Sequence, residues 1–355
     1  MLHALPPRLA ARDGLTRRTL ATLADAPACA IPLIDFSCFL HARDAAEKRH
    51  TADAIVAGFK QALGFIYLKE HGVSEATIRN VFAKSGEFFS LPTETKDSLR
   101  WEDPRAKRGY VAIGREQASQ SSDPDEIAKR RASAPDYKET MEIGRDWDAT
   151  WKNQWPAEGD APRFKDTMLD FYRTCHGLHV QVMRAIALGL GLGEAFFATL
   201  VDQQCHTLRL LSYPPVPTAL LRKEGQARVA PHSDYGSITL LFQDAVGGLE
   251  VQHPHTQASQ PAVPIPGTVV VNAADLLARW RNGVLRSTLL RVVAPPAQAP
   301  GADGEVTPLR RSVAFFCNPN FDAVVACLPN CGKIAKHAPV TTEAYIVRRL
   351  ADTYT

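Results

Sequence analysis

The chain has 355 residues, 45% hydrophobic and 22% charged, a composition typical of a globular protein with a sizeable core. Forty-one basic against 38 acidic residues give a net charge of +3, and the basic residues are scattered, so we expect no nucleic-acid partner. No apolar run approaches the roughly 20 residues of a membrane span, and no secretory leader is recognisable. Seven cysteines without a CxxC pair predict reduced thiols and a cytoplasmic location.

The first half of the chain predicts helices around two short strands. Residues 1–30 mix Arg, Pro and Ala without a clear period, which predicts a loosely attached N-terminal arm. Hydrophobic periodicity predicts strands over 31–36 and 64–68 and helices over 44–63, 74–89 and 164–200. The polar stretch between residues 96 and 161 predicts loops over a core face.

After residue 206 the sequence changes to short β-rich runs separated by Gly, Pro and Asn. Strands are predicted over 207–213, 237–243, 248–251, 268–272, 289–293 and 312–317, and a closing helix over 341–354. Many short strands between turn signals favour a barrel or a jelly roll.

The motif Pro231-His232-Ser233-Asp234 lies just before an apolar strand. Residues two apart on an extended chain point to the same face, so the His232 imidazole and the Asp234 carboxylate can converge on one ion. A His and a carboxylate that leave metal positions open are two thirds of the facial triad of non-haem iron oxygenases. A surface or turn pair without metal is the alternative for such an isolated motif.

A second pair of residues suits an anion. Arg310 and Ser312 open the apolar strand that follows them and share one face of it, so a guanidinium and a hydroxyl lie side by side. That pair suits a bidentate grip on a carboxylate in an apolar pocket. The alternative is a strand-edge arginine in a surface salt bridge.

Seven segments, in order from residue 31 to 320, resemble one enzyme family. They are IPLIDFS (31–37), GFIYLKEHGV (64–73), FFSLP (88–92), LLSYP (210–214), HSDYGSITLL (232–241), GGLEV (247–251) and RRSVAFFCNPN (310–320). The chain is similar to the isopenicillin N synthase-like iron(II)/2-oxoglutarate dioxygenases. Within that family RGYVAIGRE (108–116), KETMEIG (138–144) and DLLARW (275–280) most resemble the fungal thymine hydroxylase and related oxygenases of fungal secondary metabolism.

The resemblance implies a fold and a domain organisation. It implies a mainly β protein with flanking helices and a double-stranded β-helix (jelly-roll, cupin-like) core. We therefore expect an arm at 1–30, a helical and strand region at 31–205, the dioxygenase core at 206–320 and a helical extension at 321–355. It also implies Fe(2+), 2-oxoglutarate and O2 as cofactor and cosubstrates, and a small-molecule substrate.

The resemblance also implies roles for individual residues. His232 and Asp234 become the first two iron ligands and the catalytic pair, while Arg310 and Ser312 hold the distal carboxylate of 2-oxoglutarate and Tyr213 touches the same cosubstrate. Arg209, Leu211 and Tyr213 alternate on a strand and should face one way, with Arg209 deeper toward the substrate. Phe316 would stack on a substrate ring such as a pyrimidine, or is plain core.

The sequence departs from the family at the third iron ligand. The family pattern of Asn, then Ser, then His-Arg-Val is present as NGVLRSTLLRV (282–292), and Leu290 occupies the histidine position. Leucine has no lone pair, so we expect weakened iron binding. His253 and His255 lie on what should be a hairpin turn away from the pocket, so neither is expected to substitute.

Three hypotheses follow from this departure. The chain is an oxygenase that hydroxylates or desaturates a small substrate while 2-oxoglutarate is decarboxylated, with low turnover. Alternatively it is a non-catalytic binding or partner subunit, in a homo- or hetero-oligomer, that keeps the pocket. In the third, Leu290 is an introduced substitution in a competent enzyme.

Overall fold

The computed structural model describes residues 31–61, 63–103, 105–106, 108–115, 136–221, 226–254, 256–295, 306–328, 331 and 334–354. These fall within one unit, Ile31–Thr355. The predicted N-terminal arm, residues 1–30, lies outside the described residues. The boundaries expected at residues 205 and 320 stay predictions.

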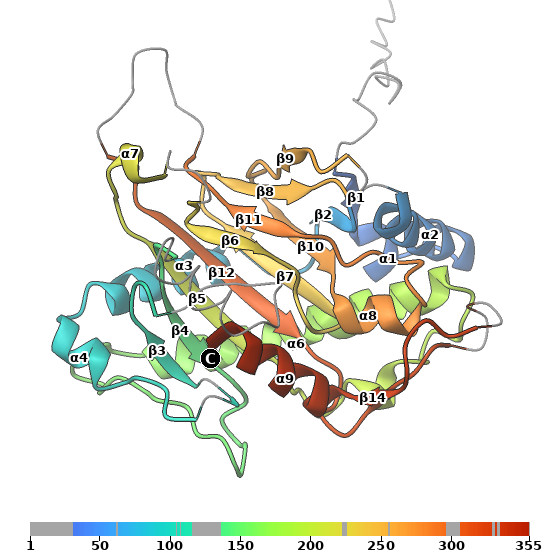
Figure 1. Ribbon diagram of the computed structural model, residues 1–355. Helices are drawn as coiled ribbons and strands as arrows, with labels where there is room; N and C mark the ends of the chain where they lie inside the picture. Colours follow the sequence, from blue (N-terminus) through green and yellow to red (C-terminus); the bar gives the residue numbers. More distant parts are fainter. Residues whose placement is uncertain are drawn as a thin grey trace, which may run out of the picture. The chain divides into compact units, whose positions relative to one another are not determined.

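Two β-sheets form the centre of this unit (Figure 1). The larger has the strand order β1-β2-β10-β7-β12-β5-β4-β3, and the smaller has the order β6-β11-β8-β9. The strands are β1 (Leu33–Asp35), β2 (Phe65–Lys69), β3 (Gly109–Val111), β4 (Glu139–Ile143), β5 (Thr207–Tyr213), β6 (Val229–His232), β7 (Ile238–Gln243), β8 (Leu249–Gln252), β9 (Ser259–Pro261), β10 (Thr268–Ala273), β11 (Leu290–Val292), β12 (Arg310–Cys317), β13 (Val324–Val325) and β14 (Val340–Thr341). In the two sheets β1 runs parallel to β2, whereas the other neighbours pair antiparallel. The predicted mainly β jelly-roll core with flanking helices is confirmed.

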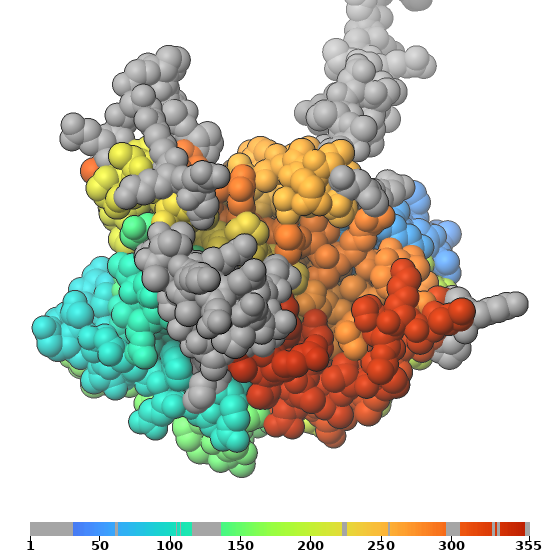
Figure 2. All heavy atoms as spheres, in the orientation of Figure 1, coloured from blue at the N-terminus to red at the C-terminus, as the bar shows by residue number. Residues whose placement is uncertain are grey.

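Helices pack on one face of the larger sheet. The helices are α1 (Ser37–Leu40), α2 (Ala45–Gln61), α3 (Glu75–Phe89), α4 (Thr93–Asp97), α6 (Phe164–Gly189), the 3-10 turn η1 (Ala198–Leu200), α7 (Thr218–Leu221), α8 (Asp275–Trp280) and α9 (Thr342–Tyr354). α6 contacts both α2 and α3, and the three helices bury their apolar stripes against the sheet (Figure 1). On the surface, the red C-terminal residues border the orange residues that precede them in the chain (Figure 2).

The central strands are buried on both faces, which explains their nearly continuous apolar runs. In β12, Val313, Phe315 and Cys317 point into the core under the helices. Arg310, Ser312 and the other alternate residues of β12 point between the two sheets. A second apolar cluster fills the space between the sheets around a cavity. One strand therefore supplies both the core and the wall of a site.

Two sequence predictions differ from the structure. The stretch between residues 96 and 161 contains β3 and β4, which extend the larger sheet. β4 escaped recognition because its buried glutamates break the apolar pattern, and they are tolerated because cations reach them, as Lys96 reaches Glu139 at 2.8 Å. The long helix ends at Gly189 and not at residue 200, because Gly191 takes a positive φ of 73° that stops it.

No helix in the described part of the chain combines the length and apolarity that crossing a bilayer requires.

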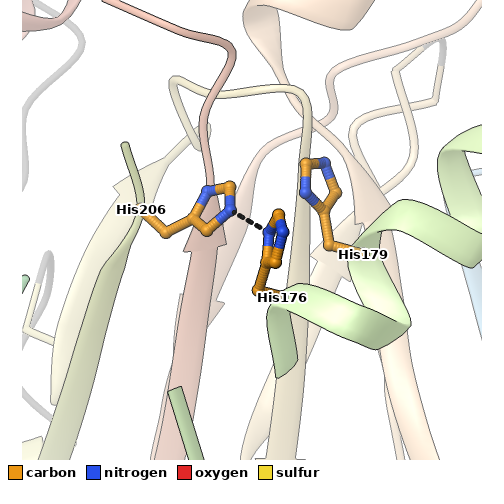
Figure 3. Close-up of side chains that lie close together, drawn as sticks. All are labelled: His176, His179 and His206. Atoms are coloured by element: carbon orange, nitrogen blue, oxygen red, sulfur yellow. Dashed lines mark hydrogen bonds between the residues drawn. The ribbon is translucent and has the colours of Figure 1, made fainter. Parts of the chain in front are cut away.

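Three histidines gather beneath the larger sheet, where α6 meets the start of β5 (Figure 3). His176 and His179 lie one turn apart on α6, and His206 directly precedes β5. His179 and His206 are fully buried, and one ring nitrogen from each of the three lies within 4.8 Å of the others. Three imidazole nitrogens at this spacing could bind a metal ion such as Zn²⁺.

The hydrogen bonds instead indicate a chain of neutral imidazoles. The backbone N–H of Asn318 donates to His206 Nδ1 at 3.1 Å, so the proton of neutral His206 lies on Nε2. That Nε2–H then donates to His176 Nδ1 at 3.0 Å. A metal ion at His206 Nε2 would have to displace this proton and leave an imidazolate. Burial lowers the pKa of His179 to about 3 and that of His206 well below its usual value, so both rings stay neutral.

This cluster predicts acid sensitivity. The unfolded chain binds protons on these two histidines below about pH 6.5 and the folded chain does not, so stability is lost as the pH falls from 6.5 toward the folded pKa values. Each ring should remove about 1 kcal/mol of unfolding free energy between pH 7.5 and 5.5. Urea unfolding at the two pH values measures the loss of unfolding free energy. His179→Asn should make the unfolding free energy depend less steeply on pH. Equal stability at both pH values, or a melting temperature that Zn²⁺ raises in the wild type but not in His179→Asn, would contradict the neutral chain.

Candidate functional site

A cavity of about 130 Å³ lies between the two sheets. Its walls come from β4, β5, β7, β10 and β12 of the larger sheet, from β6, β8 and β11 of the smaller sheet, and from α9. All nine residues predicted for the site line it: Arg209, Leu211, Tyr213, His232, Asp234, Leu290, Arg310, Ser312 and Phe316.

His232 and Asp234 are oriented as a pair of donors. His232 Nε2 lies 3.9 Å from Asp234 Oδ1. The carbonyl of Ala230 lies 2.9 Å from His232 Nδ1, and because a carbonyl only accepts, the proton is on Nδ1 and the lone pair is on Nε2. Asp234 Oδ2 accepts the hydroxyl of Thr239 at 2.6 Å and the amide of Asn272 at 2.8 Å, which fixes the carboxylate.

The position expected for a third iron ligand is occupied by the apolar side chain of Leu290. Leu290 pairs with His232 across β6 and β11 and with Val251 across β8, and it belongs to the apolar cluster between the sheets. The cross-strand register brings the Leu290 side chain beside His232, where it offers no donor atom. The cavity therefore fits two of the three protein ligands of a facial triad and lacks the third.

Arg310 dominates the end of the cavity formed by β5 and β12. Its side chain is 1% exposed. Nη1 donates to Ser312 Oγ and Nη2 to Gln243 Oε1, both at 3.3 Å, while Nε has no hydrogen-bond partner among the described residues. The guanidinium carbon lies 4.7 Å from the centre of the Tyr213 ring. Long bonds to neutral partners leave this cation able to grip an anion.

A second cation, Arg209, lies farther along β5 and is paired within the protein. Its Nε is 2.6 Å from Glu142 Oε1 on β4, and its guanidinium carbon is 5.1 Å from the centre of the Phe316 ring. Lys138, also on the cavity wall, pairs with Asp136 at 3.0 Å. This region of the cavity is polar but balanced in charge.

Several residues of the site were missed from the sequence. Thr239, Asn272, Glu142 and Lys138 line the cavity. Thr239 and Asn272 break otherwise apolar strands, a signal that could have marked them. Lys138, Thr140 and Glu142 are two residues apart and so share one face of the segment that forms β4. They lie in KETMEIG, one of the segments that carried the family resemblance.

Asp275, at the start of α8, connects α9 to the loop after β6 and to the loop before β11. Its carboxylate accepts the hydroxyl of Tyr345 at 2.8 Å and that of Ser287 at 2.6 Å, and its backbone N–H donates to the Asp234 carbonyl at 2.9 Å. α9 is thereby held against the cavity, which it lines with Ile346 and Leu350. Burial and the neighbouring Asp275 raise the pKa of Tyr345, so its hydroxyl keeps the proton that it donates.

Of the two histidines considered as substitutes for a third ligand, the structure describes His253 only. The backbone of His253 closes a turn between β8 and β9 through a 2.7 Å bond from its N–H to the Ala258 carbonyl, and its side chain is not on the cavity wall. His255 lies outside the described residues.

Comparison with known proteins identifies the family of the chain. Residues 31–158 match the family described as "non-haem dioxygenase in morphine synthesis N-terminal", and residues 203–319 match the "2OG-Fe(II) oxygenase superfamily". The chain is 34% identical to the 2-oxoglutarate-dependent dioxygenase frbA of Dothideomycetidae sp. (strain 11243), over 84% of this chain and 88% of that protein. It is 35% identical to the proline hydroxylase buaE of Petromyces alliaceus, over 82% of this chain and 90% of that protein.

Among solved structures, the full-length thymine hydroxylase of Neurospora crassa in complex with alpha-KG and thymine superposes with a TM-score of 0.82 at 46% identity, covering 91% of this chain and 97% of that one. Iron(II), 2-oxoglutarate and O2 are the cofactor and cosubstrates of this family. The chain belongs to the 2OG-Fe(II) oxygenase superfamily.

Proposed function

We propose that this member of the oxygenase family binds 2-oxoglutarate and a small organic substrate in the cavity. Its iron would be held by only two protein ligands, and its catalytic turnover would therefore be slow. The observation that carries the proposal is the position of Leu290, beside His232 in a cavity that otherwise keeps the residues of the family's site. The chemistry would be hydroxylation or desaturation of the substrate, coupled to decarboxylation of 2-oxoglutarate to succinate and carbon dioxide.

The proposed cosubstrate site is the end of the cavity around Arg310. Arg310 would grip the distal carboxylate of 2-oxoglutarate, with the hydroxyls of Ser312 and Tyr213 as further donors. Support comes from the burial of Arg310 and from the weak bonds that it makes to neutral partners. A charge-assisted bond in an enclosed pocket contributes more than one in water.

The proposed metal position is the space between His232 Nε2 and Asp234 Oδ1. The hydrogen bonds of both groups leave these atoms free to donate to a metal, which supports binding. Losing a residue that merely supports a ligand costs about 10- to 100-fold in affinity, so losing a ligand should cost at least as much. Weak iron binding is the expected consequence.

The substrate would occupy the part of the cavity lined by Arg209, Leu211 and Phe316. Arg209 offers N–H donors to a carbonyl, and Phe316 offers a ring face. The similarity to a Neurospora crassa enzyme crystallised with thymine supports a pyrimidine-like substrate. The similarity to a proline hydroxylase indicates that members of this family also act on other small molecules. The side chains that line the pocket, and not the fold, therefore determine the substrate.

The second candidate function is a non-catalytic binding or partner subunit that keeps the pocket, alone or in a homo- or hetero-oligomer. The packing of Leu290 among Val229, Val251 and Val292 favours this second function, because a side chain packed in an apolar cluster does not provide a metal-binding group. Iron-dependent succinate formation distinguishes the two functions. A cytoplasmic location remains our proposal from the cysteine pattern.

The first test restores the missing ligand. Leu290→His should raise iron(II) affinity by about tenfold or more, since one imidazole is regained, and should bring 2-oxoglutarate-dependent succinate release. Anaerobic iron titration and succinate assays measure both. Leu289→His is the matched control, because the preceding residue points to the opposite face of the strand. Equal iron affinity in the wild type, Leu290→His and the control would exclude a metal role for position 290.

The second test addresses the cosubstrate. In metal-free protein with EDTA, 2-oxoglutarate should still bind, and Arg310→Leu should weaken that binding by about 10- to 100-fold because a charged hydrogen-bond donor is lost. Isothermal titration calorimetry measures the dissociation constants. Arg311→Leu serves as the control, since the neighbouring arginine lies on the other face of β12. Unchanged affinity in Arg310→Leu would contradict the assignment.

A further inference from the structure

A second buried arginine lies next to the proposed cosubstrate site. Arg228 directly precedes β6 and is 0% exposed. Its Nη2 donates to the hydroxyl of Thr307 and, at 3.0 Å, to the carbonyl of Pro308, while its Nε and Nη1 have no hydrogen-bond partner in the described part of the chain. Arg228 is not on the cavity wall, so direct contact with a ligand is not its role.

Arg228 and Arg310 lie on one aromatic ring. Their guanidinium carbons are 6.0 Å and 4.7 Å from the centre of the Tyr213 ring. The two cations are close enough that the charge of Arg310, after burial, lowers the pKa of Arg228 to about 10. Arg228 therefore stays protonated at neutral pH, and the two arginines place two positive charges at one end of the cavity.

These two charges lack the partners that other cations of the cavity possess. Arg209 pairs with Glu142 at 2.6 Å and Lys138 with Asp136 at 3.0 Å. Neither Arg228 nor Arg310 forms an ion pair with any carboxylate among the residues that the structure describes. The Asp244 carboxylate attracts the charge of Arg228 only through space, since its oxygens accept the backbone N–H groups of Arg311 and Val246. Burying like charges together is costly unless an anion arrives. The end of the cavity around Tyr213 is thus built with an excess of positive charge.

Arg228 also supports the chain that carries Arg310. Its two hydrogen bonds hold residues 307 and 308, immediately before β12 begins at Arg310. The same guanidinium therefore fixes where Arg310 starts and adds to the positive potential there. The first effect needs hydrogen bonds, and the second needs only charge.

We propose that Arg228 is a positioning residue of the anion site, which by its charge tightens the binding of ligands that carry a carboxylate at the end far from the metal position. This inference rests on the proposed function of Arg310. It identifies the preferred ligands as 2-oxo diacids over 2-oxo monoacids.

The experiment compares two ligands of equal length in metal-free protein, 2-oxoglutarate and 2-oxopentanoate, which has a methyl group in place of the distal carboxylate. Calorimetry gives their dissociation constants for the wild type, Arg228→Gln, Arg228→Lys and Arg310→Leu. Arg291→Gln is the matched control, because Arg291 pairs with Glu250 on the neighbouring strands of the smaller sheet. Circular dichroism verifies folding, and Arg228→Met replaces Arg228→Gln if the latter does not fold.

Arg228→Gln should weaken 2-oxoglutarate binding by about tenfold or more, and it should leave 2-oxopentanoate binding unchanged. Arg228→Lys keeps the charge and should stay within about threefold of the wild type, as should Arg291→Gln. Equal losses in Arg228→Gln and Arg228→Lys, or the same loss for both ligands, would reduce Arg228 to a structural role and overturn the proposal. Wild-type affinity in Arg228→Gln, with Arg310→Leu still impaired, would overturn it while leaving the proposed function intact. A wild type that does not bind 2-oxoglutarate would overturn both.

Discussion

The antiparallel pairing of β11 with β6 is the constraint on which the site depends. It sets Leu290 directly across from His232, and both side chains line the cavity. The register with β6 shifts between Leu290 and Val292, whereas β11 pairs with β8 without a shift from Leu290 to Val292. The regular pairing with β8 fixes the face on which residue 290 lies, because a shift of one residue would send it to the other face. The identity of this one side chain separates the proposed two-ligand metal position from a complete facial triad.

Charge is distributed unevenly along the cavity. Toward β4 the cations are matched by carboxylates, as Arg209 is by Glu142. Toward the start of β12 the buried guanidiniums of Arg310 and Arg228 have neutral partners. An anion is therefore attracted to one end of the cavity and a neutral polar group is accepted at the other. Under the proposed function, this asymmetry would orient a diacid along the cavity.

Much of the site could be predicted because strand geometry is local. The two-residue period placed His232 with Asp234, Arg310 with Ser312, and Arg209 with Leu211 and Tyr213, and the structure has all seven on one cavity. The partners of these residues could not be predicted in the same way. Glu142 reaches Arg209 from a strand that looked like a loop, because its charges hid the apolar pattern.

Other features depend on contacts between distant segments. Asp275 binds Ser287 and Tyr345, which are 12 and 70 residues away in the chain. His206 meets His176 only because α6 packs under the start of β5. Neither arrangement leaves a periodic signal in the sequence, since packing and not local conformation brings the groups together. The expectation that position 290 stands where a third iron ligand would lie came from the family resemblance of its neighbours, and it stays a prediction.

The most direct test is a crystal structure of the wild-type chain grown anaerobically with iron(II) and 2-oxoglutarate, with anomalous data collected at the iron edge. We expect the distal carboxylate of 2-oxoglutarate on Arg310 and Ser312, together with iron of partial occupancy held by His232 and Asp234 alone. Full iron occupancy with a third protein ligand, or 2-oxoglutarate bound away from Arg310, would contradict this description of the site.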